Sequence, residues 1–287
     1  MSGSRVDVQP LENPSHDATP GRTSGLRDRM VRLARATAIK TLQLIVGLAV
    51  WQAIVRILDI DSRIVPAPTD VLASLWMQTE SGIILAALWL TLQETIIGFI
   101  IGSALGIALA VVLSEFALLR AALHPYVVAL QAVPKVAVAP LFLIWFGFGI
   151  ESKIALVISI MFFPVLVNTM AGLDSVSEEQ LELMRALRAS RWQTLMRLKV
   201  YAALPYIFAS FEVCLVLSLT AAVIAEMLGS GTTIGLGTLI RIFESRVDAA
   251  GMFAVLIVLS VLGVVLHGLV LIAQRHFLRW NRNVGSE

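Results

Sequence analysis

The sequence is poor in charge and in cysteine. Of its 287 residues, 15% are charged and 57% are apolar, and the mean hydropathy is +0.84. A soluble domain carries about a quarter charged residues, so this composition excludes a water-soluble globule and indicates an integral membrane protein. The single cysteine, Cys214, excludes a disulfide framework and an all-cysteine metal site within one chain. No basic stripe is interleaved with aromatic residues, which argues against nucleic-acid binding.

Motifs for chemistry are also missing. No glycine is followed by lysine, so the phosphate-binding motif G-x-x-x-x-G-K-[ST] is absent and the chain is not an ATPase of that type. The four histidines form no H-E-x-x-H zinc motif, and no G-x-S-x-G nucleophile motif occurs. We therefore expect no catalytic residue, no metal ligand and no cofactor bound by this chain.

The first forty residues differ from the rest. Residues 1–25 are rich in Ser, Pro, Gly, Asp and Asn, which predicts disorder, and they hold no apolar signal-peptide core. Residues 26–40 are basic and compatible with an amphipathic helix at the membrane surface. We assign 1–40 as a disordered basic N-terminal tail, 41–280 as a membrane domain and 281–287 as a C-terminal tail.

Six stretches are apolar enough to cross a bilayer, which takes about 20 helical residues. The second is interrupted only by Glu94, and the third contains three prolines and Lys135. The sequence therefore predicts an all-α, polytopic membrane helical bundle with about six transmembrane helices. The predicted spans are 41–58, 83–113, 121–148, 154–173, 203–228 and 250–273.

The placement of Lys and Arg predicts the orientation of the bundle. With six spans, both termini lie on one side, together with the connections 114–120 and 174–201. That side carries sixteen basic residues and the opposite side carries four. We expect a multi-pass protein of the cell inner (plasma) membrane with both termini in the cytoplasm. The four basic residues of the outer side are Arg63, Lys153, Arg241 and Arg246.

The connection between the fourth and fifth spans is a polar insert of 28 residues. Ser177 and Gln180 fit a capping box that begins a helix. An apolar residue recurs every three positions, at Leu181, Met184 and Leu187, which gives an edge suited to a groove on another protein. The alternative is a surface helix that rests on lipid headgroups.

This insert resembles the EAA loop of ABC-importer permeases. The pattern of that family is E-A-A, three residues, G, nine residues, then I-x-L-P, and residues 182–184, Leu198 and Val200 fall on it. Arg188 stands in place of the glycine and Tyr201 in place of the proline. Because a glycine permits a turn between two short helices, Arg188 predicts a more continuous or differently angled helix.

Other segments are similar to the nitrate/sulfonate/taurine type of this family, the binding-protein-dependent transport system inner-membrane components. Residues 185–193 resemble its LGASRWQ variant, residues 134–147 its third-span signature, and residues 225–237 the exit of its fifth span. The resemblance covers about residues 80–275.

The resemblance implies the permease half of an ATP-driven importer. A dimer of separate ATPase subunits, which use ATP and Mg²⁺, would grip a cytoplasmic coupling helix, and an extracytoplasmic binding protein would deliver a small anionic solute such as a sulfonate, nitrate or taurine. A second permease subunit, by family expectation a second copy, would complete the assembly in the lipid. The ATPase-coupling residues implied are Glu179, Glu182, Leu183, Met184, Ala186, Leu187, Arg188, Ala189, Ser190, Arg191 and Trp192.

Charged residues inside membrane spans are costly and usually face protein or a water-filled path. Pro134 and Pro140 flank Lys135, where missing backbone donors kink the third span. We hypothesise that these three residues and Glu226 line the translocation path and that Lys135 attracts the anion. The alternatives for Lys135 are an ion pair with an acid such as Glu94 or Glu212, or a side chain that extends to the membrane interface. The alternative for Glu226 is an interfacial cap at a helix end.

Gly98, Gly102 and Gly106 form a stripe on the second span that allows close helix packing. The sequence leaves open whether the stripe packs within the chain or at a subunit interface.

Three other functions are alternatives to this one. A permease of the same type for a vitamin precursor or an aromatic acid fits the same motifs. An ion-gradient-driven secondary transporter would need paired acids in broken helices and inverted repeats, and no convincing repeat relates the two halves. An intramembrane enzyme would need a nucleophile–base pair or metal ligands within the spans, and none is evident.

Overall fold

The structure of the chain, a computed structural model, describes residues 24–229 and 233–278, and within these residues every regular element is a helix. The chain divides into two compact units, residues 1–54 and residues 55–287. The elements are α1 (Ser24–Ile57), α2 (Pro68–Glu80), α3 (Ile83–Glu115), α4 (Ala117–Ala132), the 3₁₀ turn η1 (Lys135–Val138), α5 (Ala139–Phe146), α6 (Ile150–Asp174), α7 (Glu178–Ala186), α8 (Arg191–Thr194), the π turn η2 (Leu195–Lys199), α9 (Val200–Leu228), α10 (Leu236–Ser245) and α11 (Ala249–Phe277).

Helix α1 begins earlier than the predicted first span. It joins the basic stretch 26–40 and the apolar stretch Thr41–Ile57 in one helix of 34 residues. The helix expected over 26–40 is therefore confirmed, and the last part of the predicted tail is helical. Residues 1–23 and the predicted tail 281–287 lie outside the described residues.

Among the described residues, four helical runs are long and apolar enough to cross a membrane: α3, α6, the run Arg191–Leu228 and α11. A fifth crossing is present if the helices on either side of Pro134 form one span. The apolar part of α1 is shorter than these. The bundle is confirmed, while the count of six spans remains a prediction.

The third predicted span is broken into two helical pieces that are bent by 84°. Val133 is extended, with ψ 128°, because the ring of a following proline disfavours the helical conformation. Pro134 has no backbone N–H to continue the helix. Pro140 lies in the first turn of α5. Backbone N–H groups in a first turn have no acceptor within the helix, so the absence of an N–H at Pro140 breaks no hydrogen bond. The predicted kink is confirmed, but it is a sharp elbow and the span is not continuous.

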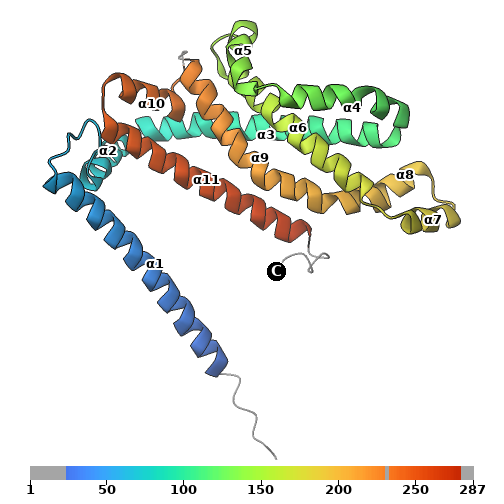
Figure 1. Ribbon diagram of the computed structural model, residues 1–287, viewed down its shortest axis with the longest axis horizontal. Helices are drawn as coiled ribbons and strands as arrows, with labels where there is room; N and C mark the ends of the chain where they lie inside the picture. The colour runs from blue at the N-terminus through green and yellow to red at the C-terminus, as the bar shows by residue number, and fades with distance from the viewer. Residues whose placement is uncertain (1–23, 230–232, 279–287) are drawn as a thin grey trace, which may run out of the picture. The chain divides into compact units, whose positions relative to one another are not determined.

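Helices α3, α6 and α9 pack against one another at the centre of the second unit, and α6 and α9 cross α3 (Figure 1). Helices α10 and α11 pack on α9, α2 packs on α11, and α5 packs on α6. One cluster of buried apolar side chains lies where α3 meets α9, α10 and α11, and another where α3 meets α4, α6 and α9. The apolar faces of the long helices are thus buried against each other at both ends of α3.

The glycine stripe of α3 faces α6 of the same chain. A Cβ atom at Gly106 would lie 2.8 Å from the backbone oxygen of Phe162, and one at Gly102 would lie 2.9 Å from the Cβ of Met161. A side chain at either position would therefore push the two helices apart. Packing within the chain, one of the two interpretations of this stripe, is confirmed.

We predict that Gly106→Ala destabilises the protein because the new methyl group overlaps backbone atoms of α6, at a cost of about 1–3 kcal/mol. The measurement is the thermal unfolding midpoint of the purified protein in detergent. Gly268→Ala is the matched control: nothing lies within 4 Å of a Cβ at Gly268 in α11, so this change should leave the midpoint equal or raise it, since alanine favours helix. Equal midpoints for the two variants would contradict the close packing of α3 on α6.

Candidate functional site

The predicted coupling segment folds into two short helices, α7 and α8, joined by a turn. At the start of α7, the Ser177 hydroxyl accepts from the Gln180 N–H at 3.3 Å, and the Gln180 side chain accepts from the Ser177 N–H at 3.2 Å. The predicted capping box is confirmed. Ser190 and Gln193 form a second capping box at the start of α8, a reason in the sequence for the break between the helices.

Arg188 occupies the turn and has the left-handed conformation, with φ 52°. The Ala189 N–H donates to the Met184 carbonyl and the Arg188 N–H donates to the Arg185 carbonyl, which is the bonding pattern of a Schellman motif. The expectation that Arg188 makes the helix more continuous is therefore wrong. The arginine takes the glycine-like conformation at a cost of about 1–2 kcal/mol, which the backbone bonds and the second capping box offset.

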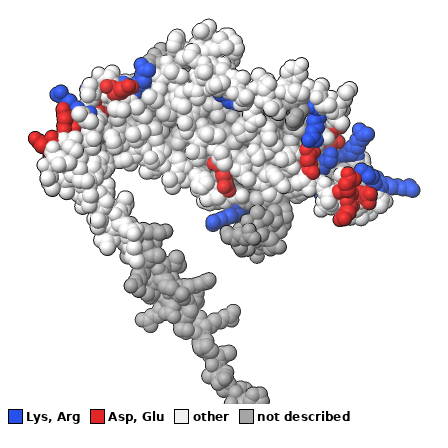
Figure 2. Space-filling view, viewed as in Figure 1, with Lys and Arg blue, Asp and Glu red and all other residues white. Residues whose placement is uncertain are grey.

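Three large apolar side chains of this segment face outward. Leu183, Leu187 and Trp192 are 61%, 68% and 65% exposed. Leu181 and Met184 of the predicted apolar edge are half-buried, and its third member, Leu187, is among the three exposed residues. Figure 2 shows acidic and basic side chains gathered over this end of the second unit. Of the other predicted coupling residues, Ala189 is half-buried and Glu179, Glu182, Ala186, Arg188, Ser190 and Arg191 are exposed.

Helix α9 continues α8 and η2 without a break, as the run Arg191–Leu228. Tyr201, which stands at the family's proline position, lies in the first turn of α9. Pro205 falls one turn later inside the helix, and the preceding turn, Leu195–Lys199, is π-helical. Such turns occur where a helix absorbs an irregular hydrogen-bond pattern.

Lys135 lies at the elbow between α4 and α5, next to Pro134. Its Nζ donates to the Gln131 carbonyl at 3.0 Å and lies 5.0 Å from the centre of the Phe163 ring. Neither contact is an acid, and Glu94 pairs with another lysine, so the alternative of a Lys135–Glu94 ion pair is wrong. The ammonium retains hydrogen-bonding capacity for a ligand.

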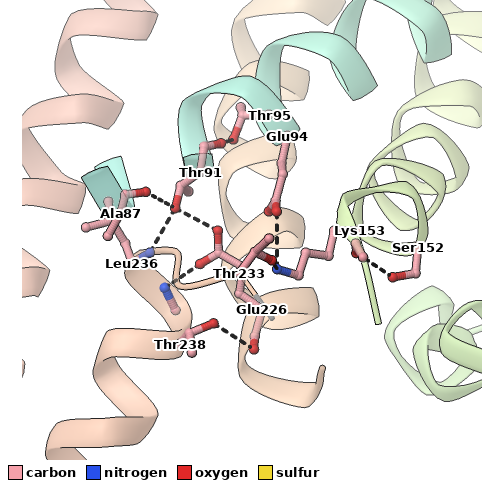
Figure 3. Close-up of polar contacts among 12 residues, drawn as sticks. Ala87, Thr91, Glu94, Thr95, Ser152, Lys153, Glu226, Thr233, Leu236 and Thr238 are labelled. Atoms are coloured by element: carbon pink, nitrogen blue, oxygen red, sulfur yellow. Dashed lines mark hydrogen bonds and ion pairs between the residues drawn. The ribbon is translucent and has the colours of Figure 1, made fainter. Parts of the chain in front are cut away.

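A fully buried ion pair joins α3 to α6 (Figure 3). Lys153 Nζ lies 3.3 Å from Glu94 Oε1, and both side chains are 0% exposed. Lys153 also donates to the Thr233 hydroxyl at 2.9 Å. Lys153, which the sequence placed in the outer connection before the predicted fourth span, lies in the first turn of α6. Glu94 thus serves as a polar contact between packed helices.

Glu226, near the end of α9, is also 0% exposed and caps the start of α10. One carboxylate oxygen accepts from the Thr91 hydroxyl at 2.7 Å and the other accepts from the Gly237 N–H in the first turn of α10 (Figure 3). The positive end of a helix stabilises a carboxylate there. The two roles predicted for Glu226 were a place in the translocation path and a helix-end cap. Glu226 does cap a helix end, but the helix is α10 and the cap is buried. The structure does not bring Lys135 into contact with this carboxylate.

The Gly-Leu-Gly sequence after α9 lets the backbone approach Glu226 closely. A Cβ atom at Gly235 would overlap the Glu226 carboxylate, and one at Gly237 would overlap the Val223 carbonyl. Between them, the Leu236 N–H donates to the Thr91 hydroxyl at 2.9 Å. We refer to Thr91, Glu94, Lys153, Glu226 and the Gly235–Gly237 turn as the buried polar junction.

Thr91 and Lys153 were not predicted as members of this junction. The sequence held a signal for the lysine. Glu94 is the sole charged residue in the predicted second span, so it requires a cation from another helix. Lys153 immediately precedes the predicted fourth span. Within residues 24–229 and 233–278 no group of three side chains is suited to holding a metal ion. The side chains of the junction connect α3 with α6, α9 and α10.

Comparison with known proteins gives a consistent result. A family model described as binding-protein-dependent transport system inner membrane component matches residues 72–279. The riboflavin transport system permease protein RibX of Chloroflexus aurantiacus is 33% identical over 233 residues, which are 81% of this chain and 86% of that protein. The taurine transport system permease protein TauC of Escherichia coli is 28% identical over 261 residues, covering 88% and 93%. The inward-facing MetNI methionine ABC transporter has the same fold, with a TM-score of 0.62 at 18% identity over 70% of this chain and 98% of that one.

We predict that Lys153→Met lowers stability by about 3–5 kcal/mol, because it leaves a carboxylate buried without its cation. The thermal unfolding midpoint measures this loss, and Glu94→Gln added to Lys153→Met should recover part of it. Lys199→Met is the matched control: the Lys199–Glu115 pair, 2.8 Å apart, is about one-fifth exposed, so its loss should cost about 1 kcal/mol or less. Equal losses for the two lysines, or no recovery in the double variant, would show that burial of the pair is not decisive.

Proposed function

The chain belongs to the family of binding-protein-dependent transport system inner membrane components, and we propose that it passes a small anionic solute through the membrane. It is a permease subunit of an ABC importer of the nitrate/sulfonate/taurine type. As a transport subunit it needs energy from elsewhere, and we assign ATP hydrolysis to separate ATPase subunits that bind ATP and Mg²⁺. This chain is proposed to hold no cofactor.

The observation that carries this assignment is the outward face of the coupling segment. Leu183, Leu187 and Trp192 are exposed on two short capped helices. Exposed aromatic and aliphatic side chains on a fixed backbone are typical anchors for a partner's groove. We propose that an ATPase subunit receives these side chains and that its closure displaces the segment.

The orientation and the assembly follow from the same proposal. With Lys153 buried in α6, the proposed outer side retains three of its four basic residues, which sharpens the excess of positive charge on the side of the coupling segment. We place that segment and both termini in the cytoplasm. A second permease subunit, two ATPase subunits and an extracytoplasmic binding protein would complete the importer.

The anionic character of the solute rests on Lys135. The 84° elbow presents its ammonium beside Pro134 with a carbonyl and an aromatic ring as its contacts. A cation inside a membrane span that has no acid among its contacts favours an anionic ligand. We propose that Pro134, Lys135 and Pro140 form part of the translocation path, whereas Glu226, enclosed in the buried polar junction, would act on it only through packing.

A second candidate is a vitamin-type solute. RibX, named as a riboflavin permease, shares 33% identity with this chain. Riboflavin-like solutes would stack on aromatic side chains and would not depend on the charge of Lys135. The two candidates thus differ in what removal of the ammonium should do.

We predict that Trp192→Ala reduces co-purification of the ATPase subunit by about tenfold or more, because buried aromatic anchors dominate interface energies. The measurement is the ATPase-to-permease ratio after affinity purification through a tag on the permease. Trp76→Ala is the matched control, since Trp76 on α2 is also exposed, at 72%, and lies outside the segment. A reduced ratio for both variants, or for neither, would refute docking through the coupling segment.

We predict that Lys135→Met reduces uptake of an anionic solute by about tenfold, the equivalent of about 1.4 kcal/mol, while Lys135→Arg retains most of it. Uptake is measured in proteoliposomes that contain the complete importer and the loaded binding protein. Reduced uptake with both substitutions would point to packing rather than charge. Unchanged uptake with Lys135→Met would remove this residue from the pathway.

A further inference from the structure

A cavity of about 610 Å³ lies between the coupling segment and the corner where α3 meets α4. Helices α7 and α8 form one wall, the ends of α3 and η2 form another, and α4 begins at its edge. This volume is within the range of small-molecule sites. It is far larger than the space that a single water molecule requires. The residues that line it are Ser114, Glu115, Ala117, Leu181, Arg185, Ala189, Arg191, Thr194 and Lys199.

The charge of this cavity is unbalanced. Lys199 is neutralised by Glu115, with Nζ 2.8 Å from the carboxylate oxygen. Arg185 and Arg191 have no acid within ion-pair distance in the described part of the chain. Arg185 and Arg191, both exposed, therefore line one cavity together with Ser114. Guanidinium and hydroxyl groups are donors that suit a phosphate group.

The corner beside the cavity carries exposed apolar side chains. Phe116 is 62% exposed and Leu118 is 86% exposed, and Ala117 between them lines the cavity. Both side chains follow directly after Glu115, the last residue of the apolar helix α3. At the end of a membrane-spanning helix, exposed apolar residues lie among acyl chains close to the headgroups. With α3 across the membrane, the cavity would open at the level of the lipid phosphates.

We propose that this cavity binds the phosphate headgroup of an anionic membrane phospholipid through Arg185 and Arg191. Basic pockets at the cytoplasmic face of membrane helices are suited to such headgroups. The bound phosphate would connect α7 and α8 to the end of α3, so that the lipid braces the coupling segment against the bundle. This site is separate from the outward face of Leu183, Leu187 and Trp192, and it does not depend on the identity of the solute.

The experiment is lipid retention by the assembled transporter. The complex is reconstituted in nanodiscs of phosphatidylcholine with added phosphatidylglycerol, extracted into mild detergent, and analysed by native mass spectrometry for bound lipid. The wild type should retain phosphatidylglycerol in preference to phosphatidylcholine. Arg185→Gln combined with Arg191→Gln should reduce that retention about tenfold, and Arg185→Lys combined with Arg191→Lys should preserve most of it.

The matched control is Arg241→Gln combined with Arg246→Gln, which removes two exposed arginines near α10 and should leave retention unchanged. Retention that is equal in the wild type and the Arg185/Arg191 glutamine variant would overturn the proposal. Lipid retention is also compared between the permease without its ATPase subunits and the assembled complex. Retention that is present in the first and absent from the second would overturn the proposal, because an acidic side chain of the ATPase subunit would then be the occupant.

A second arm distinguishes lipid from soluble phosphate. Inorganic phosphate is titrated into the same complex, and its effect on retained phosphatidylglycerol is measured. Retention that persists at millimolar phosphate supports the lipid headgroup as the ligand. Phosphate binding that requires Arg185 and Arg191 in a complex that retains no phosphatidylglycerol would refute a lipid site and leave a soluble anion as the ligand.

Discussion

The ion pair between Lys153 and Glu94 is the interaction on which the arrangement of the second unit depends. Each charge would cost several kcal/mol in the apolar interior without the other, and both side chains are completely buried. Because Lys153 belongs to α6 and Glu94 to α3, the two helices are stable in one register. Thr91 lies three residues before Glu94 on the same face of α3 and binds Glu226, which extends the constraint to α9 and α10.

Short polar contacts between helices require that backbones approach closely, and the glycines supply this. The stripe at Gly98, Gly102 and Gly106 brings α3 against α6, and Gly235 admits the Glu226 carboxylate to the first turn of α10. The glycine stripe and the lone acid of the second span are neighbours on α3, whereas the Gly-Leu-Gly turn is distant from them in sequence. They serve one junction, because each is needed for a buried charge to meet its partner.

Composition and periodicity predicted the helical membrane bundle, because long apolar runs and capping signals are local features of the sequence. The elbow at Pro134 was predictable for the same reason. The pairing of Lys153 with Glu94 is tertiary, and no local pattern specifies which lysine reaches which acid. Arg188 was mispredicted because the backbone bonds of the Schellman turn, together with the cap at Ser190, outweigh the conformational preference of one residue.

The same constraints explain how the coupling segment can act on the interior of the bundle. The helical run Arg191–Leu228 has 38 residues, about 57 Å at 1.5 Å per residue, and it carries Trp192 at one end and Glu226 at the other. Leu195, at the π turn, is buried against residues of α3 and α6, so α8 cannot shift without moving the packed ends of those helices. If an ATPase subunit docks at Trp192 as proposed, a displacement there would be transmitted along this run to the buried polar junction, and α10, which is bonded to Glu226, would have to follow.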